Sequence, residues 1–224
     1  MSDDDPTRHS RAREAELISD PDSLAAREAF NGLRQFDLVI DIVDYYQHED
    51  RPFRFRPSHL LSLHRAALDG ISSYAGNYRP AGIEIGGSRH EPPGAHQVPE
   101  LVEDMCEYIN SKWSEVHAVP LAAYVLWRLN WIHPFTDGNG RTSRAASYLI
   151  MCCRLGYVLP GKRTIPDQIS EDKAPYYKAL EAADESLRSG SLCLTKVEEM
   201  LSMMLGRQLY SVHTDATGAK PELE

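Results

Sequence analysis

Apolar residues recur every three or four positions along most of the chain, which is the spacing of amphipathic helices. The first such segment runs from Asp22 to Tyr46, with Asp22 or Ser23 as the residue that caps its first turn. Residues 121–131 are apolar on nearly every side, so this segment is expected to form a central, buried helix. The same spacing predicts further helices over residues 58–68, 98–113, 142–155, 171–188 and 194–209.

Residues 76–93 do not follow the helical spacing. Ile83 and Ile85 alternate with Glu84, and glycines lie on both sides, so the sequence predicts a short β-hairpin in this segment. With helices everywhere else, the predicted fold class is all-α: a helical bundle with one small hairpin.

The two ends of the chain differ from the middle in composition. Residues 1–20 are polar and charged and are expected to form a mobile leader, and residues 211–224 are expected to form a disordered tail. Residues 21–210 contain no internal repeat and no low-complexity block. They are therefore predicted to fold as a single domain.

The overall composition is that of a soluble globular protein, with 42% apolar and 25% charged residues among 224. A formal net charge of −9 argues against non-specific nucleic-acid binding. The apolar runs are far shorter than the roughly 20 residues of a membrane helix, and the first residues lack the apolar stretch of a secretory signal. The four cysteines form no CxxC pair, and a reduced, cytoplasmic setting is expected.

The stretch "NWIHPFTDGNGRTSR", residues 130–144, combines a histidine, an acid, two glycines and two arginines between two predicted helices. Arg141 and Arg144 lie three positions apart and therefore on one face at the start of the second helix. The positive end of the helix dipole lies there, so two arginines are unfavourable unless an anion binds. Gly138 and Gly140 let the backbone approach such an anion closely. The loop is interpreted as a phosphate site.

Two other side chains give this site a chemistry. Asp137 is suited to hold a divalent cation that bridges phosphate oxygens. His133 has a reference pKa near neutrality and is the candidate general base. The plainer alternative is an Asp-Gly-Asn-Gly turn with solvated arginines and a helix-capping histidine. It does not explain why the turn contains two destabilising glycines and places two positive charges at the positive end of a helix dipole.

The residues from His133 to Arg144 resemble the signature of the Fic domain family, H-P-F-x-[D/E]-G-N-G-R-x-x-R, at every specified position. The resemblance extends over about residues 32–185, including "YRPAGIEIGGSRHEPP", which is similar to the flap of that family. It implies an all-helical core and protein adenylylation, the transfer of AMP from ATP to a Tyr, Thr or Ser hydroxyl of a target protein. ATP is then the substrate and Mg²⁺ or Mn²⁺ the cofactor.

The resemblance also implies roles for individual residues. His133 would deprotonate the target hydroxyl, Asp137 would bind the metal ion, and Phe135 would pack beneath the loop. The anion cradle would consist of Gly138, Asn139 and Gly140, with Arg141 on the β-phosphate and Arg144 on the terminal phosphates.

Many members of the family carry an inhibitory helix whose glutamate pairs with the second arginine of the signature. Here "SLAAREAFNG" is similar but differs in spacing, since Ser23 and Glu28 are five apart. Glu28 is the candidate clamp on Arg144, and a solvent-facing helix glutamate is the alternative. "SRAREA", with Ser10 and Glu14, is a second partial match. A small antitoxin protein that supplies the acid is a further alternative.

Other parts of the resemblance concern the target and the base. Ile83, Glu84, Ile85 and Gly86 would dock an extended target segment by strand addition. Tyr177 is the candidate on the adenine side, although it and Tyr176 also suit the core. Asp172 stands where an Asn is common, which puts a base contact from that position in doubt. His90 and His96 are read as loop histidines rather than as a metal site with His133.

Three alternatives to protein adenylylation remain at this point. The fold is also compatible with another nucleotide donor, and with removal of AMP assisted by Glu28. A nucleotide-sensing module without turnover is the third, although an intact His133 and Asp137 argue against it. No membrane or direct nucleic-acid partner is expected, and a homo-oligomer is one option.

Overall fold

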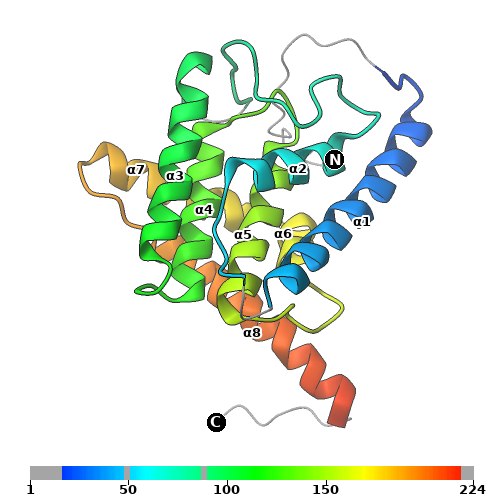
Figure 1. The fold of residues 1–224 in the computed structure, drawn as a ribbon, viewed down its shortest axis with the longest axis vertical. Helices are drawn as coiled ribbons and strands as arrows, with labels where there is room; N and C mark the ends of the chain where they lie inside the picture. The colour runs from blue at the N-terminus through cyan, green and yellow to red at the C-terminus, as the bar shows by residue number, and fades with distance from the viewer. Residues whose placement is uncertain (1–16, 48–50, 87–89, 218–224) are drawn as a thin grey trace, which may run out of the picture.

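The protein is described by a computed structural model in which residues 17–47, 51–86 and 90–217 are placed. The regular structure of these residues is helical and includes no strand, so the all-α class is confirmed (Figure 1). In chain order the helices are α1 (Pro21–Tyr46), α2 (Pro57–Leu68), the 3-10 helix η1 (Ala95–Gln97), α3 (Val98–Lys112), α4 (Ala118–Ile132), α5 (Asn139–Leu155), α6 (Ile165–Glu171), α7 (Ala174–Arg188) and α8 (Thr195–Thr217).

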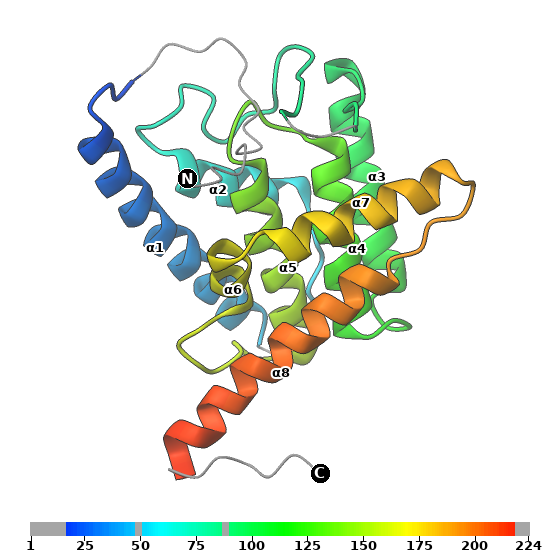
Figure 2. The same cartoon turned by 180° about the vertical axis from the view of Figure 1, so that it is seen from behind.

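The helices α4 and α5 form the centre of the bundle, and α7 and α8 cross one side of them, the side that faces the viewer in Figure 2. Most α4 residues are buried, as its apolarity on all sides predicts. Small residues in the middle of α5, Ala145 and Ala146, allow the two helices to approach closely, and the Ser147 hydroxyl donates to the Ala122 carbonyl at 2.9 Å. The loop between α4 and α5 is therefore anchored in the core at both ends.

The first half of α1 packs on α2 through polar side chains. Asn31 is fully buried, and its amide donates to the carbonyl oxygen of Asp69 at 2.8 Å. The Gln35 amide donates to the Leu63 carbonyl at 2.9 Å. Carbonyl oxygens in and just after α2 thus find donors on α1, although the side-chain oxygen of Asn31 is itself buried without a hydrogen-bond partner among the described residues.

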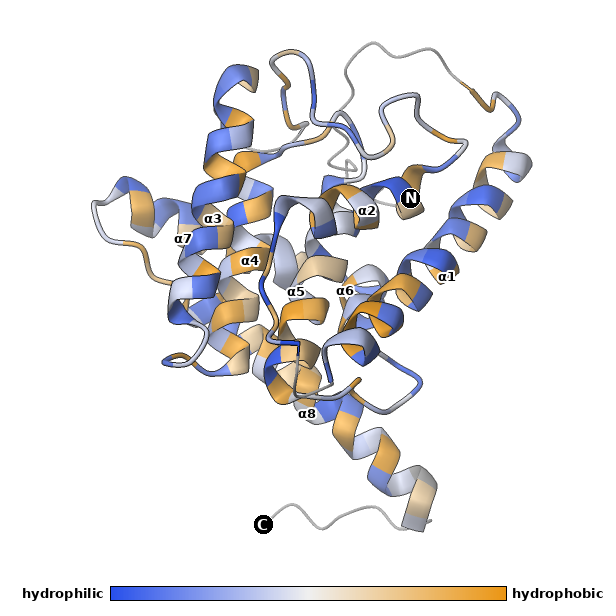
Figure 3. Cartoon of the chain, viewed as in Figure 1, coloured by the Kyte–Doolittle hydropathy of each residue, from blue (hydrophilic) through white to orange (hydrophobic). Residues whose placement is uncertain are grey.

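Two residues of the apolar pattern that predicts α1 lie on its solvent side. Phe30 is 53% exposed and Leu33 is 68% exposed. Apolar burial is confined to the second half of the helix, at Val39 and Val43. The mixture of apolar and polar positions along α1 is visible in Figure 3. The spacing locates the helix correctly, but the buried face of its first half is polar.

The predicted hairpin is wrong for the part of the segment that the structure describes. Residues 76–86 contain no strand, and residues 87–89 lie outside the described ranges. The Arg79 N–H donates to the Pro134 carbonyl at 2.9 Å, and its guanidinium donates to the carbonyls of Ala81 and Pro93. Proline has no N–H group to donate to a β-sheet hydrogen bond, and the Arg79 side chain already donates to the carbonyls of Ala81 and Pro93. The two arms of the predicted hairpin are therefore held together by Arg79 and not by strand pairing.

Helix boundaries differ from the predictions in two places. The predicted helix over residues 171–188 begins at Ala174, and the separate helix α6 precedes it. Pro175 requires this break, because proline is tolerated only in the first turn of a helix. The helix α5 begins at Asn139 rather than Thr142, and it ends at Gly156 with positive φ, as predicted.

The predicted mobile leader and disordered tail consist mostly of residues that the structure does not describe. Residues 1–16, which make up most of the predicted leader, and residues 218–224 are not among the described residues. The helix α8 continues to Thr217 and thus occupies the beginning of the segment predicted as a disordered tail. Among the helices that the structure describes, none combines the length and apolarity needed to cross a membrane.

Candidate active site

The loop between α4 and α5 begins with a residue in an unusual conformation. His133 follows α4 with a φ of 51°, and it is the one residue other than glycine with positive φ in the described part of the chain. Its N–H still donates to the Leu129 carbonyl at 2.9 Å, so it ends α4 as a left-handed C-cap. This turn directs the chain away from α4 and into the loop.

A reciprocal pair of hydrogen bonds closes the loop. The Asn139 side-chain amide donates to the Phe135 carbonyl at 2.8 Å, and its oxygen accepts the Phe135 N–H at 2.9 Å. Asn139 was expected in the anion cradle, but its side chain braces the loop from within. Its backbone N–H stays at the free end of α5, where the first turn of a helix has donors without intrahelical acceptors.

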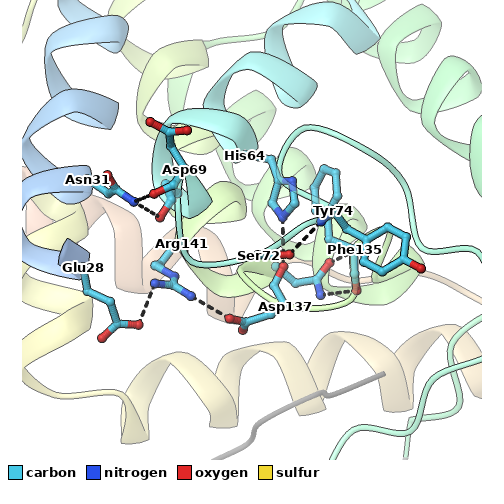
Figure 4. A network of polar contacts seen from close by, with 11 residues as sticks. Glu28, Asn31, His64, Asp69, Ser72, Tyr74, Phe135, Asp137 and Arg141 are labelled. Carbon is cyan, nitrogen blue, oxygen red and sulfur yellow. Dashed lines mark hydrogen bonds and ion pairs between the residues drawn. The ribbon is translucent and has the colours of Figure 1, made fainter. Parts of the chain in front are cut away.

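His64 of α2 supports the loop on the side that faces α2 (Figure 4). Its ring stacks on Phe135 with 3.8 Å between centroids, and both side chains are fully buried. The Gly76 N–H donates to His64 Nδ1 at 2.9 Å, so Nε2 carries the proton and donates to the Asp137 carbonyl at 3.0 Å. Phe135 therefore packs beneath the loop as expected, with a histidine as its partner.

The glycines of the loop are needed for space as well as conformation. Gly138 has a φ of 73°, and a Cβ atom there would lie 2.4 Å from Leu68 Cδ2. A Cβ atom at Gly140 would lie 3.2 Å from an Arg144 guanidinium nitrogen. Arg144 thus folds back over the start of its own helix, close to the free N–H groups.

These residues surround one cavity of about 400 Å³. His133, Asp137, Arg141 and Arg144 all line it, so the structure brings together the four side chains that the sequence singles out for chemistry. The three cradle residues, Gly138, Asn139 and Gly140, line it as well. Of the other candidates, Glu28, Ile85 and Tyr177 also line the cavity, whereas Ile83, Glu84 and Gly86 do not.

The environment of His133 keeps its imidazole neutral. The side chain is 7% exposed, and burial is the main reason that its pKa falls to about 4. The charges of Arg79 and His90 lower the pKa further, while the Asn130 carbonyl and Asp137 oppose the shift. Nδ1 lies 3.3 Å from the Asn130 carbonyl oxygen, which can only accept, so Nε2 is the nitrogen that can take a proton.

The two arginines have different surroundings. Arg141 donates to Asp137 at 2.9 Å and to Glu28 of α1, also at 2.9 Å (Figure 4). Glu28 therefore pairs with Arg141, and its expected pairing with Arg144 is wrong. Arg144 forms no hydrogen bond or ion pair within the described residues, and burial lowers the pKa of its guanidinium. A desolvated cation without a carboxylate is suited to receive an anionic ligand.

The far end of the cavity contains residues that the sequence reasoning missed. The Trp127 indole N–H donates to Asp184 Oδ1 at 2.8 Å, and both residues line the cavity. The sequence could have indicated the residues at α7, because the positions there that line the cavity are three or four apart and therefore lie on one face of a helix. The positions that were missed are Lys173, Leu180 and Asp184, which share this spacing with the expected Tyr177, and the other unexpected lining residues are His90, Asn130, Trp131 and Tyr176.

The cavity offers limited protein ligation for a metal ion. Among the described residues, no cluster of three or more His, Cys, Asp or Glu side chains is placed to hold one. Asp137 is a single carboxylate beside the free end of α5. Magnesium fits this arrangement only together with a nucleotide, because it is commonly held by one or two carboxylates plus substrate phosphates.

The sequence model of the Fic/DOC family matches residues 54–151, a range that contains α2, α3, α4, the loop and most of α5. The loop with His133, Asp137 and both arginines lies entirely inside the matched range, so the matched residues form most of the cavity wall.

The chain is similar in sequence to curated proteins from fruit flies. It is 36% identical over 128 residues to the protein adenylyltransferase Fic of Drosophila persimilis, and 35% identical to that of Drosophila willistoni. Each alignment covers 56% of this chain but only 23% and 24%, respectively, of the two relatives. The chain therefore spans about a quarter of the length of these proteins.

Solved structures share the fold. A Fic domain containing signaling protein from Bacteroides thetaiotaomicron has a TM-score of 0.68 at 21% identity, covering 87% of this chain and 76% of that one. A Fic family protein from Desulfovibrio desulfuricans has a TM-score of 0.63 at 23% identity, covering 89% and 56%. BepC of Bartonella tribocorum, solved with bound AMPPNP, has a TM-score of 0.58 at 17% identity, covering 84% and 88%.

We expect the folded protein to keep His133 neutral until the pH approaches 4, because burial penalises the imidazolium. NMR titration of the ring, assigned by its absence in His133→Ala, should give a midpoint of about 4. The unfolded value is about 6.5. Acidification from about 6.5 to about 4 should therefore lower the free energy of unfolding, and His133→Ala should remove that part of the loss. A midpoint near the unfolded value would contradict the described burial.

Replacement of Gly138 should damage the cradle more than an equivalent change elsewhere. Gly138→Ala combines a strained φ with a clash against Leu68, whereas Gly156→Ala has a φ of 84° and open space. The control should cost about 1–2 kcal/mol, the penalty of a left-handed alanine. Urea unfolding should show a clearly larger loss for Gly138→Ala. Equal losses would mean that the loop relaxes around the new methyl group.

Proposed function

We propose that the chain is a protein adenylyltransferase that transfers AMP from ATP to a Tyr, Thr or Ser hydroxyl of a target protein. One observation carries the proposal: a neutral His133 and two arginines, Arg141 and Arg144, line the same cavity. A base beside an anion site is needed for nucleotidyl transfer to a hydroxyl group and is not needed for nucleotide binding alone. The names of the fruit-fly relatives support the same activity.

The transfer balances as a single displacement. His133 Nε2 takes the proton of the target hydroxyl, and the hydroxyl oxygen forms a bond to the α-phosphorus of ATP. The bond from that phosphorus to the bridging oxygen breaks, and pyrophosphate leaves with the bonding electrons. Positioned base catalysis of this kind typically contributes about 10²–10⁴-fold. The neutral state of His133 supports its role as the base.

The phosphates are proposed to lie at the start of α5. Backbone N–H groups of Asn139 and Gly140 and the positive end of the helix dipole favour an anion there. Arg144, which has no carboxylate partner within the described residues, is proposed to bind the terminal phosphates. Arg141 is proposed for the β-phosphate, after exchanging one of its carboxylate partners for the nucleotide.

Asp137 is the proposed ligand of a Mg²⁺ or Mn²⁺ ion that accompanies ATP. Such an ion would neutralise negative charge on the phosphates. The Asp137 carboxylate is 42% exposed on its side chain and bonded to Arg141, so it is accessible to an incoming ion. The carbonyl of the same residue is held by His64, which fixes the backbone from which the carboxylate projects.

The base of the nucleotide is proposed to occupy the end of the cavity between α4 and α7. Tyr177 and Leu180 supply apolar surface there. Asp184 uses Oδ1 to accept from Trp127, and its second oxygen has no partner within the described residues. A free carboxylate oxygen can accept a hydrogen bond from an amino group, and adenine carries an exocyclic amino group. These features support an adenine nucleotide.

The target segment is proposed to approach along residues 83–86. Only Ile85 of this segment lines the cavity, which supports Ile85 as the side chain nearest the nucleotide. Docking by strand addition through Ile83, Glu84 and Gly86 stays a prediction, as does a cytoplasmic location. A small antitoxin partner and a homo-oligomer also stay predictions.

Glu28 is proposed to restrain the site through Arg141. The ion pair occupies the arginine that is proposed to bind the β-phosphate. The Arg141 side chain is 26% exposed and that of Glu28 is 46% exposed, and pairs of this exposure contribute about 1 kcal/mol or less. The proposed restraint is therefore weak enough for ATP to displace. Because Glu28 lines the cavity, removal of AMP with its assistance is the second candidate activity.

ATP labelled on the α-phosphate should transfer label to protein, whereas γ-labelled ATP should not. His133→Ala should abolish the transfer and leave ATP binding nearly unchanged, because the imidazole is assigned to proton transfer rather than to the phosphates. Label from the γ-position would indicate phosphorylation instead. Absence of α-label from wild type and from Glu28→Gly alike would refute the transferase, and release of AMP from modified protein would favour the second activity.

Glu28→Gln should accelerate automodification by at most about 5-fold, since an exposed ion pair contributes about 1 kcal/mol or less. Glutamine keeps the length of the side chain and the helix propensity of α1. Asp37→Asn, at an exposed position of the same helix, should leave the rate unchanged. High salt should accelerate wild type but not Glu28→Gln, because salt screens the pair. If neither the substitution nor high salt changes the rate of automodification, Glu28 does not restrain the site.

A further inference from the structure

Arg79 lies in the segment after α2 and is 3% exposed, yet it has no carboxylate partner within the described residues. Its guanidinium instead donates to three carbonyl oxygens. Nε donates to His133 at 2.8 Å, Nη1 donates to Ala81 at 2.8 Å, and Nη2 donates to Pro93. A buried cation is costly, so this arrangement needs a compensating role.

Two of the Arg79 contacts, together with one contact of His90, hold the turn that carries the base. The Arg79 N–H donates to the Pro134 carbonyl at 2.9 Å, while Nε binds the carbonyl of His133 itself. The neighbouring Trp131 carbonyl receives His90 Nε2 at 2.7 Å. These carbonyls lie at or just beyond the C-terminal end of α4, where the carbonyl oxygens of a helix have no intrahelical N–H donors and where cations are favoured.

The turn needs such support. A left-handed conformation in a residue with a Cβ atom costs about 1–2 kcal/mol, and His133 has a φ of 51°. Without an external donor, the His133 carbonyl would be buried and unpaired. Arg79 removes that penalty, and because its side chain is planar it fixes the orientation of the carbonyl as well.

The remaining two contacts join the ends of the segment that borders the cavity. Ala81 and Pro93 flank a segment whose described residues, 82–86 and 90–92, include Ile85 and His90 of the cavity wall. One guanidinium therefore binds both ends of this segment and the catalytic turn. The segment and the base are held by the same side chain.

We propose that Arg79 is a positioning residue that locks His133 and the cavity-bordering segment into one unit. The proposal rests on the proposed adenylyl transfer for its kinetic consequence. Its geometric part is independent, because the orientation of His133 can be observed without any reaction. Lysine cannot replace Arg79, since an ammonium group is a single point and lacks the planar fork that reaches three carbonyls.

Arg79→Lys should lower kcat for AMP transfer by about 10²-fold, the scale of a misplaced catalytic group. The Kd for ATP should change by less than about 2-fold, because Arg79 does not line the cavity. Arg154→Lys is the matched control. Arg154 Nε donates to the Val116 carbonyl at 3.0 Å, away from the cavity, so its loss should leave kcat unchanged.

A second variant separates charge from geometry. Three charged or titratable groups act on His133, namely Arg79, His90 and Asp137. Arg79→Gln removes one cation, so the pKa of His133 should rise, whereas Arg79→Lys should keep it low. Both variants should lose kcat. A purely structural role would instead lower stability and ATP affinity together and would leave the His133 titration where it is in wild type.

One measurement uses the wild-type protein and therefore does not require that any variant folds. The Arg79 Nε–H should exchange slowly with solvent in NMR experiments, because it is buried and bonded to His133. Rapid exchange, or a wild-type kcat in Arg79→Lys, would overturn the proposal. If wild type transfers no AMP while Arg79→Lys still shifts the His133 resonances, the proposed function fails and the positioning role stands.

Discussion

The two hydrogen bonds between the Asn139 side chain and the backbone of Phe135 close the loop that joins α4 to α5. They hold the first residue of α5 against the middle of the loop, so the free N–H groups of that helix face the same space as His133. His64 stacks on Phe135 and holds the Asp137 carbonyl from the other side. The positions of His133, Asp137 and Arg141 at the cavity follow from this closure.

The cavity has an electrostatic imbalance that a nucleotide would correct. Arg141 and Arg144 lie near the positive end of α5, and the carboxylates nearest to them are bonded to Arg141 only. Arg144 has no acceptor among the described residues, although burial disfavours its charge. A polyphosphate supplies the missing negative charge at that point, which explains why the fold accepts two like charges at this end of a helix.

The sequence alone located most of the helices and indicated the chemistry of the loop, because both depend on residues close together in the chain. The spacing of apolar residues located α4 and α5. The residues from His133 to Arg144 were recognisable because their glycines and arginines would destabilise an ordinary turn. Contacts between distant segments were not accessible in the same way. The pairing of Glu28 with Arg141, the Arg79 contacts that replace a hairpin and the position of Asp184 all depend on how helices pack.

The polar packing of α1 on α2 has a consequence for how the protein tolerates change. Asn31 and Gln35 each match a specific carbonyl, so neither position accepts an apolar residue without leaving a buried oxygen unpaired. Phe30 and Leu33 face outward on the same turns and contribute little to that packing. The surface beside Arg141 is therefore open to redesign or to evolutionary drift, while the helix beneath it stays in register.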